Sequence, residues 1–107
     1  MKFKINNREW EIIELSQEKI KEKIKEYDGE VEEKGIYFGS TQTSNQKIYL
    51  DKDLCIDQKK QTLMHELMHC YIVCFLFSTK NYDEEDLCNI SANSHDLIHE
   101  IVEQYFK

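Results

Sequence analysis

The chain has 107 residues, enough for one domain with a single hydrophobic core, so we expect residues 1–107 to form one unit. Fourteen Lys and Arg against 21 Asp and Glu give a formal charge of -7, which argues against a nucleic-acid partner. A composition of 40% hydrophobic and 33% charged residues is that of a soluble globular domain.

The amino-terminal residues contain no apolar stretch of the signal-peptide kind. The longest apolar run, residues 70–77, is too short to span a bilayer. We therefore expect a cytoplasmic protein with no membrane partner. In that compartment the cysteines are expected to be reduced thiols rather than a disulfide framework. They are Cys55, Cys70, Cys74 and Cys88.

The first strands are predicted near the amino terminus. Residues 2–5 and 9–14 have strand-like polarity patterns on either side of the turn-forming pair Asn6 and Asn7, which predicts a hairpin.

A helix and a second hairpin are expected next. Ser16 is expected to open an amphipathic helix that runs to Tyr27 and stops at Gly29, with a solvated Lys/Glu face. Residues 35–42 and 47–50 are β-prone and are joined by four polar residues, which makes a second hairpin plausible.

The second half is predicted to be helical. Residues 57–77 contain no Gly or Pro and become densely apolar after Thr62, which indicates a long, largely buried helix with Asp57 as its N-cap. After a break at residues 78–81, an acidic capping box at residues 83–86 is expected to start a last helix. Its expected core stripe is Leu87, Ile90, Ser91, Ser94, Leu97, Ile98, Ile101 and Tyr105. Strands followed by helices predict an α+β fold.

An HExxH sequence, His65-Glu66-Leu67-Met68-His69, lies inside the predicted long helix. At about 100° per residue, His65 and His69 share one face, one turn apart, where two imidazoles can hold one Zn²⁺. Glu66 is close enough to act on a zinc-bound water without binding the metal. The uncharged flanks fit a helix buried beside a dry metal site, and the alternative is a chance combination of residues.

A catalytic zinc needs a third protein ligand and an open fourth position. The acidic start of the last helix offers four candidates, Asp83, Glu84, Glu85 and Asp86. We favour Glu85, because Asn89 follows it by four residues and the small Cys88 and Ala92 on the same side would let the two helices approach. Glu84 is the rival, because it lies nearer the apolar stripe. A helix cap without metal is the alternative for each of them.

Residues 61–69, Gln-Thr-Leu-Met-His-Glu-Leu-Met-His, and residues 85–92, Glu-Asp-Leu-Cys-Asn-Ile-Ser-Ala, resemble the zincin metallopeptidases. The likeness is closest to the small ImmA/IrrE-type proteins of phages and mobile elements. This resemblance implies that His65, His69 and a later Glu, matched here by Glu85, bind zinc, and that Glu66 is the general base.

The resemblance also implies a minimal zincin-like fold. A small twisted, mostly antiparallel sheet would pack on the HExxH helix and the C-terminal helix. An edge strand beside the cleft would pair with an extended peptide, and residues 37–42 or 47–50 would be that strand. An ordinary core hairpin is the alternative for either run.

Two functions follow as hypotheses. The first is a zinc-dependent peptidase that hydrolyses a peptide or protein substrate, with Glu66 as general base. The second is a non-catalytic acidic interaction protein of a phage or mobile element, with a structural zinc site. Glu66 separates them, because a structural site has no use for a general base. The sequence leaves the oligomeric state open.

The remaining candidates are given structural or surface roles. His95 and His99 lie one turn apart and could form a second metal pair, but a solvated polar face is the favoured interpretation. Cys70 and Cys74 project away from His65 and are expected to pack as small apolar groups. Tyr71 is expected to belong to the core.

Overall fold

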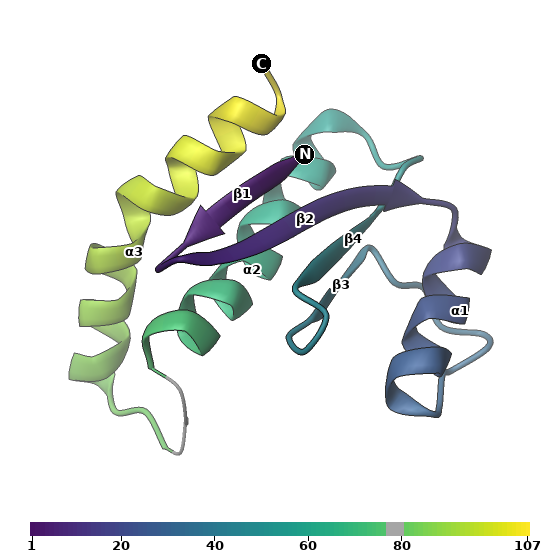
Figure 1. Cartoon of the computed structure of the whole chain (residues 1–107), viewed down its shortest axis with the longest axis horizontal. Coiled ribbons are helices and arrows are strands. Elements are labelled where there is room, and N and C mark those ends of the chain that lie inside the picture. The colour runs from purple at the N-terminus through teal and green to yellow at the C-terminus, as the bar shows by residue number, and fades with distance from the viewer. Residues whose placement is uncertain (77–80) are drawn as a thin grey trace.

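A computed structural model describes residues 1–76 and 81–107 as a small α+β fold with a four-stranded mixed sheet and three helices (Figure 1). The strands are β1 (Lys2–Ile5), β2 (Arg8–Leu15), β3 (Gly39–Gln42) and β4 (Lys47–Asp51). The helices are α1 (Gln17–Asp28), α2 (Ile56–Phe75) and α3 (Glu84–Tyr105). The strand order is β1-β2-β4-β3, so β1 and β3 form the two edges.

The sheet is mixed, which refines the expectation of a mostly antiparallel one. The pairs β1–β2 and β3–β4 are antiparallel, whereas β2 and β4 run parallel at the centre. The connection between these parallel strands carries α1 and β3, and parallel neighbours need a crossover of this kind.

The first hairpin is confirmed. Phe3 pairs with Trp10, and the two turn residues Asn6 and Asn7 have φ values of 48° and 67°. Positive φ at both central positions is what a two-residue type I′ turn requires, and Asn tolerates it better than most residues.

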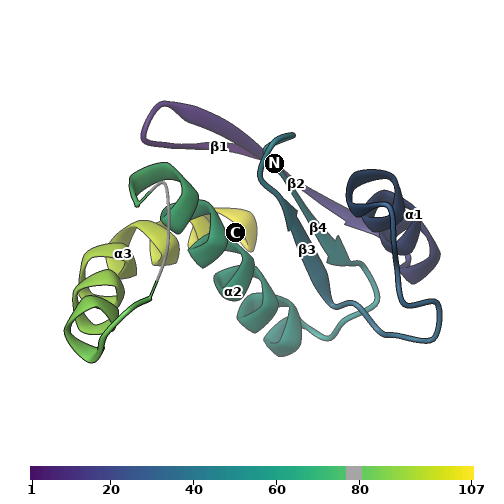
Figure 2. The ribbon, with the colours of Figure 1, turned by 90° about the horizontal axis from the view of Figure 1, so that it is seen from below.

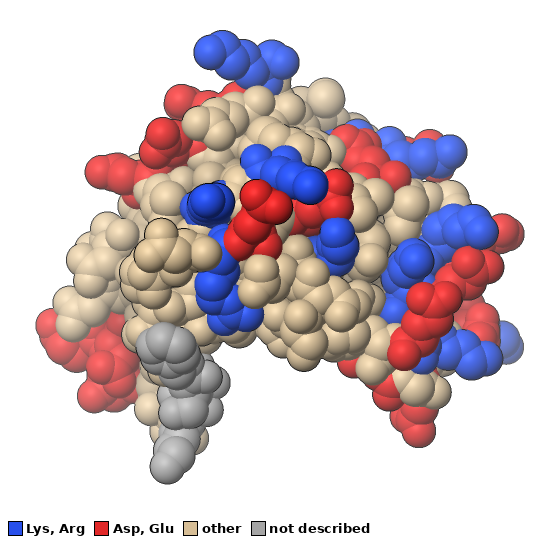
Figure 3. Space-filling view, viewed as in Figure 1, with Lys and Arg blue, Asp and Glu red and all other residues tan. Residues whose placement is uncertain are grey.

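The first helix is also confirmed. The hydroxyl of Ser16 accepts a hydrogen bond from the Lys19 amide, and Gly29 ends α1 with a φ of 82°. Lys and Glu side chains alternate on its outer surface, as the mixed colours over α1 in Figure 3 show. The predicted solvated face is therefore present.

The second hairpin exists, but the predicted strand over residues 35–42 is too long, because β3 begins only at Gly39. The partner strand β4 ends at Asp51, whose amide donates to the Phe38 carbonyl at 2.9 Å. Residues 35–37 therefore lie beyond the end of their partner strand. The side-chain amide of Gln17 binds the backbone there instead.

The sheet separates two apolar clusters. Figure 2 shows α2 and α3 on one side of it and α1 on the other. The larger cluster, on the α2 side, contains Phe3, Ile5, Trp10, Ile12, Ile48, Leu50, Leu63, Leu67, Cys70, Cys74, Ile98, Ile101 and Val102. The smaller cluster, on the α1 side, contains Ile20, Ile24 and Tyr49. Burial of alternate strand residues on opposite faces produces this division.

Helix α2 differs from its prediction at the start. It begins at Ile56 with Cys55 as N-cap, so the prediction of Asp57 as N-cap is wrong. Asp57 lies in the first turn, where its carboxylate interacts favourably with the helix dipole. The predicted end, Phe77, lies outside the described residues, as do residues 78–80 of the expected break.

Burial of α2 is confined to one face. Cys70 and Cys74 are buried, which confirms their predicted packing as small apolar groups, and burial raises the pKa of the Cys70 thiol. His65 and His69 are exposed, so the helix is less buried than its densely apolar sequence after Thr62 indicates. All four cysteines are free thiols.

Helix α3 has the predicted capping box, in which Asp83 and Asp86 each accept a hydrogen bond from the other's backbone amide. The predicted core stripe holds only in the second half of the helix. Leu87 is 56% exposed and Ser91 is exposed, because the first turns do not pack on the core. The buried residues are Ser94, Ile98, Ile101 and Val102, the last of which the predicted stripe omits. No helix in the described part of the chain is long and apolar enough to cross a membrane.

Candidate active site

The two histidines of the HExxH sequence lie side by side on the exposed face of α2. Their ring centroids are 5.1 Å apart, and the ring planes meet at 75°. Because they are separated by one helical turn, both imidazoles project from the same side of the helix. They can therefore approach a single ion from solvent without any rearrangement of the backbone.

Glu66 is the buried member of the motif, with an exposed fraction of 7%. Its Oε1 accepts a hydrogen bond of 2.8 Å from the hydroxyl of Thr41, and its Oε2 lies 4.0 Å from Nε2 of His65. The carboxylate is thus held between edge strand β3 and the first histidine. At 4.0 Å the Oε2 atom lies near the imidazole nitrogen without a direct hydrogen bond to it.

The contact between β3 and α2 depends on Gly39. A Cβ added there would lie 2.9 Å from Cγ2 of Thr62, 3.1 Å from the Tyr49 carbonyl oxygen and 3.2 Å from Cγ of Glu66. The missing side chain therefore lets the strand lie directly against the helix beside Glu66.

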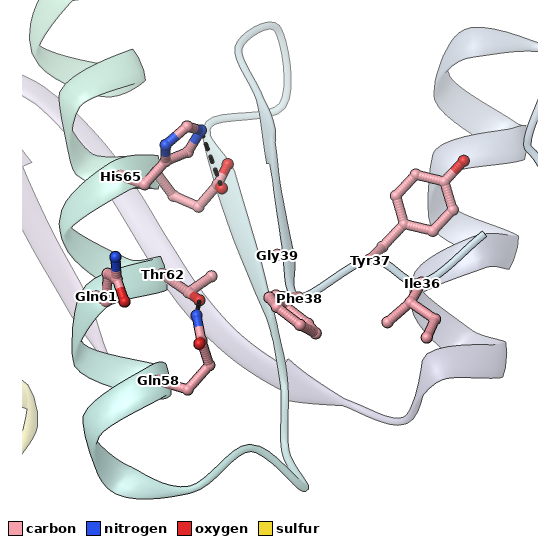
Figure 4. A pocket seen from close by; sticks show the side chains of 9 residues that line it. Ile36, Tyr37, Phe38, Gly39, Gln58, Gln61, Thr62 and His65 are labelled. Carbon is pink, nitrogen blue, oxygen red and sulfur yellow. Dashed lines mark hydrogen bonds and ion pairs between the residues drawn. The ribbon is translucent and has the colours of Figure 1, made fainter.

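A groove runs between β3 and α2. It consists of two hollows of about 330 and 450 Å³, which share Gly39, His65 and Glu66. The first continues past Phe38 and is shown in Figure 4, and the second continues past Thr41. Glu66 therefore lies at the middle of the groove, where the two hollows meet.

One wall of the groove is an unpaired strand edge. The Phe38 carbonyl bonds to β4, and backbone groups alternate in direction along a strand. The amides and carbonyls of Gly39 and Thr41 consequently point to the open side of β3. Of the two expected edge strands, residues 37–42 include the edge strand β3, whereas residues 47–50 belong to β4, which lies between β2 and β3 and is not an edge.

The structure does not bring the expected third ligand, Glu85 or its rival Glu84, to the histidine pair. Glu84 and Glu85 lie in the exposed first turn of α3, within the acidic group over the start of that helix in Figure 3. Within residues 1–76 and 81–107, no three His, Cys, Asp or Glu side chains are placed to hold one metal ion. The expected close approach of Cys88 and Ala92 to the other helix is wrong, since both are exposed. His65 and His69 are thus the two members of the expected ligand set that the structure brings together.

The other candidates have surface positions. His95 and His99 are exposed, with stacked rings at 4.2 Å, and Nδ1 of His95 lies 3.2 Å from Oδ1 of Asp96. This placement agrees with the predicted solvated face. The prediction of Tyr71 as a core residue is wrong, because it is partly exposed and packs on Phe75 at 4.8 Å.

Gly39 and Thr41 belong to residues 37–42, one of the two runs expected beside the cleft, but neither was predicted individually as a site residue. Both lay inside a predicted strand, but nothing in their local sequence indicated contact with a helix 25 residues away.

No family model, curated protein or solved structure matches the chain.

Proposed function

We propose that the protein is a zinc-dependent peptidase of the zincin type. The observation that carries the proposal is the placement of Glu66. Its buried carboxylate lies between the paired imidazoles and an open strand edge, in the middle of a groove. A groove with an unpaired strand edge suits an extended peptide, because backbone hydrogen bonds can hold it in register.

His65 and His69 would hold the metal, and Glu85 is our proposed third ligand, with Glu84 as its rival. When bound there, Zn²⁺ supplies a Lewis acid that polarises a carbonyl and lowers the pKa of water toward about 7. Glu66 accepts the proton of the attacking water at its carboxylate and returns it to the leaving amine. Gly39 and Thr41 orient the peptide backbone along β3.

Metal content and hydrolysis together test the proposal. Protein purified without added zinc should contain about one Zn²⁺ per chain by mass spectrometry, and His65→Ala or His69→Ala should lose it. His99→Ala is the matched control, because His99 also has a histidine one turn away on an exposed helix face, and this variant should keep its zinc. Full zinc occupancy in His69→Ala would contradict the assignment.

Glu66→Gln should keep the zinc and abolish hydrolysis of a quenched fluorescent peptide library, because an amide cannot take up the proton. Chelation should lower the melting temperature of the wild-type protein, since it removes the free energy of binding to the folded state. A biological effect that survives in Glu66→Gln would favour the acidic interaction protein instead.

A further inference from the structure

Two bulky apolar side chains stand exposed at one end of the groove. Ile36 is 75% exposed and Phe38 is 45% exposed, and both line the hollow that continues beyond Gly39. In Figure 4 the Phe38 ring lies on the side of its segment that faces α2, whereas the Tyr37 ring points away toward α1. Apolar side chains exposed at a concave surface mark sites of binding.

The segment that carries them is held in place on both sides. The side-chain amide of Gln17 donates to the Tyr37 carbonyl and accepts from the Tyr37 amide at 3.1 Å. The Tyr37 hydroxyl accepts from the Glu32 amide at 3.0 Å. The Phe38 carbonyl is bonded to the Asp51 amide at 2.9 Å. The two apolar side chains are therefore presented by a fixed backbone, which lowers the entropic cost of binding.

Away from the HExxH residues, the opposite wall of this hollow is uncharged. It is formed by Gln58, Gln61 and Thr62 of α2, and none of the lining residues is Lys, Arg or Asp. The ionisable residues of the lining are His65 and Glu66 of the motif and Tyr37, whose ring points away toward α1. The end of the hollow away from Glu66 therefore combines uncharged polar groups with exposed apolar side chains, which favours an apolar side chain over a charged one.

We propose that this half of the groove is a specificity pocket that receives a bulky apolar side chain of an extended peptide. The backbone of that peptide would pair with Gly39 and Thr41 on the open edge of β3. The choice of a peptide as occupant comes from this unpaired edge, which adjoins the apolar side chains directly. The inference rests on the proposed function, because it names the substrate class of the same site.

Binding to metal-free Glu66→Gln protein tests the pocket without hydrolysis. The probes are acetylated, amidated hexapeptides of Ser and Thr that carry one Phe at each position in turn, with the all-polar hexapeptide as the reference. Amide chemical shifts of the labelled protein report the site and the affinity. The best Phe peptide should bind about tenfold tighter than the all-polar peptide, or more, and should shift the amides around Phe38 and Gly39.

Phe38→Ser and Ile36→Ser should reduce this preference to less than about threefold, and their spectra verify the fold. Leu87→Ser, which replaces an exposed apolar residue of α3, is the matched control and should keep the full preference. Equal binding of the Phe and all-polar peptides would overturn the pocket. Amide shifts around Phe38 that change with protein concentration would also overturn it, because they would indicate that a second copy of the chain occupies this surface. Zinc content of the same variants, measured before the metal is removed, separates the two proposals. Normal zinc without the preference overturns only the pocket, and the preference without zinc overturns only the peptidase.

Discussion

The hydroxyl of Thr41 donates a 2.8 Å hydrogen bond to the carboxylate of Glu66, which links edge strand β3 to the middle of α2. The same hydroxyl lies 3.3 Å from the Glu66 carbonyl oxygen. Since Glu66 is buried, this donor compensates part of the cost of removing a carboxylate from water. Thr41 therefore orients the residue that the proposed reaction needs as its base.

Replacement of Thr41 tests this positioning role. Thr41→Val should lower kcat for peptide hydrolysis by about 10- to 100-fold while zinc is retained, because a supporting hydrogen bond to the base is lost. Thr41→Ser should restore kcat, because it keeps the hydroxyl. An unchanged kcat in Thr41→Val would contradict the positioning role.

The third ligand can be assigned by a competitive zinc titration. If Glu85 binds the metal, Glu85→Gln should weaken zinc binding severely, because an amide oxygen is a poorer zinc donor than a carboxylate. Glu84→Gln should keep its affinity and cost at most about 1 kcal/mol of stability from the helix dipole. The opposite result would transfer the role to Glu84. Normal affinity in both variants would point to Asp83, Asp86 or His95.

Gly39→Ala tests the close approach of β3 to α2. The added methyl group would meet the Tyr49 carbonyl oxygen at 3.1 Å, a backbone atom that cannot rotate away, and Cγ2 of Thr62 at 2.9 Å. We expect a loss of about 1–3 kcal/mol in the free energy of unfolding, measured by urea denaturation. Ser40→Ala, on the next position of the same strand, is the control and should change stability by less than about 0.5 kcal/mol. Equal effects of the two substitutions would contradict the contact.

The acid stability of the protein should depend on Glu14. Burial raises the pKa of this carboxyl, but hydrogen bonds from Lys59 of α2 and Tyr105 of α3 outweigh that effect and lower it below 4.5. A lowered folded-state pKa contributes stability that is present above 4.5 and is lost as the pH falls through the folded value. Glu14→Gln should therefore cost about 1 kcal/mol at neutral pH and little in acid.

Urea denaturation at neutral and acidic pH measures this difference. Glu103→Gln, which removes an exposed carboxylate of α3, is the control and should leave the pH dependence as in the wild-type protein. The Glu14→Gln variant could instead lose stability in acid as steeply as the wild-type protein. That result would show that the contacts of Glu14 with Lys59 and Tyr105 contribute nothing to the acid dependence of stability.

The features that could be predicted from the sequence are those controlled by neighbouring residues. Asn6 and Asn7 accept positive φ, Ser16 and Gly29 cap α1, and Asp83 with Asp86 caps α3, all through contacts within a few residues. The spacing of His65 and His69 likewise depends only on the helical repeat, and it places both rings on one face. The sequence alone therefore determined these turns and caps and the pairing of the two imidazoles.

Only the tertiary structure decided what surrounds that pair. The exposure of His65 and His69, the burial of Glu66 and its bond to Thr41 follow from the way α2 lies against β3. That placement depends on the parallel pairing of β2 with β4, which leaves β3 at the edge. Within residues 1–76 and 81–107, no third metal-ligating side chain lies beside the two histidines. The reason is that the first turns of α3, which carry Glu84 and Glu85, do not pack on the core. Contacts between distant segments depend on strand order and helix packing, which no local pattern of residues encodes.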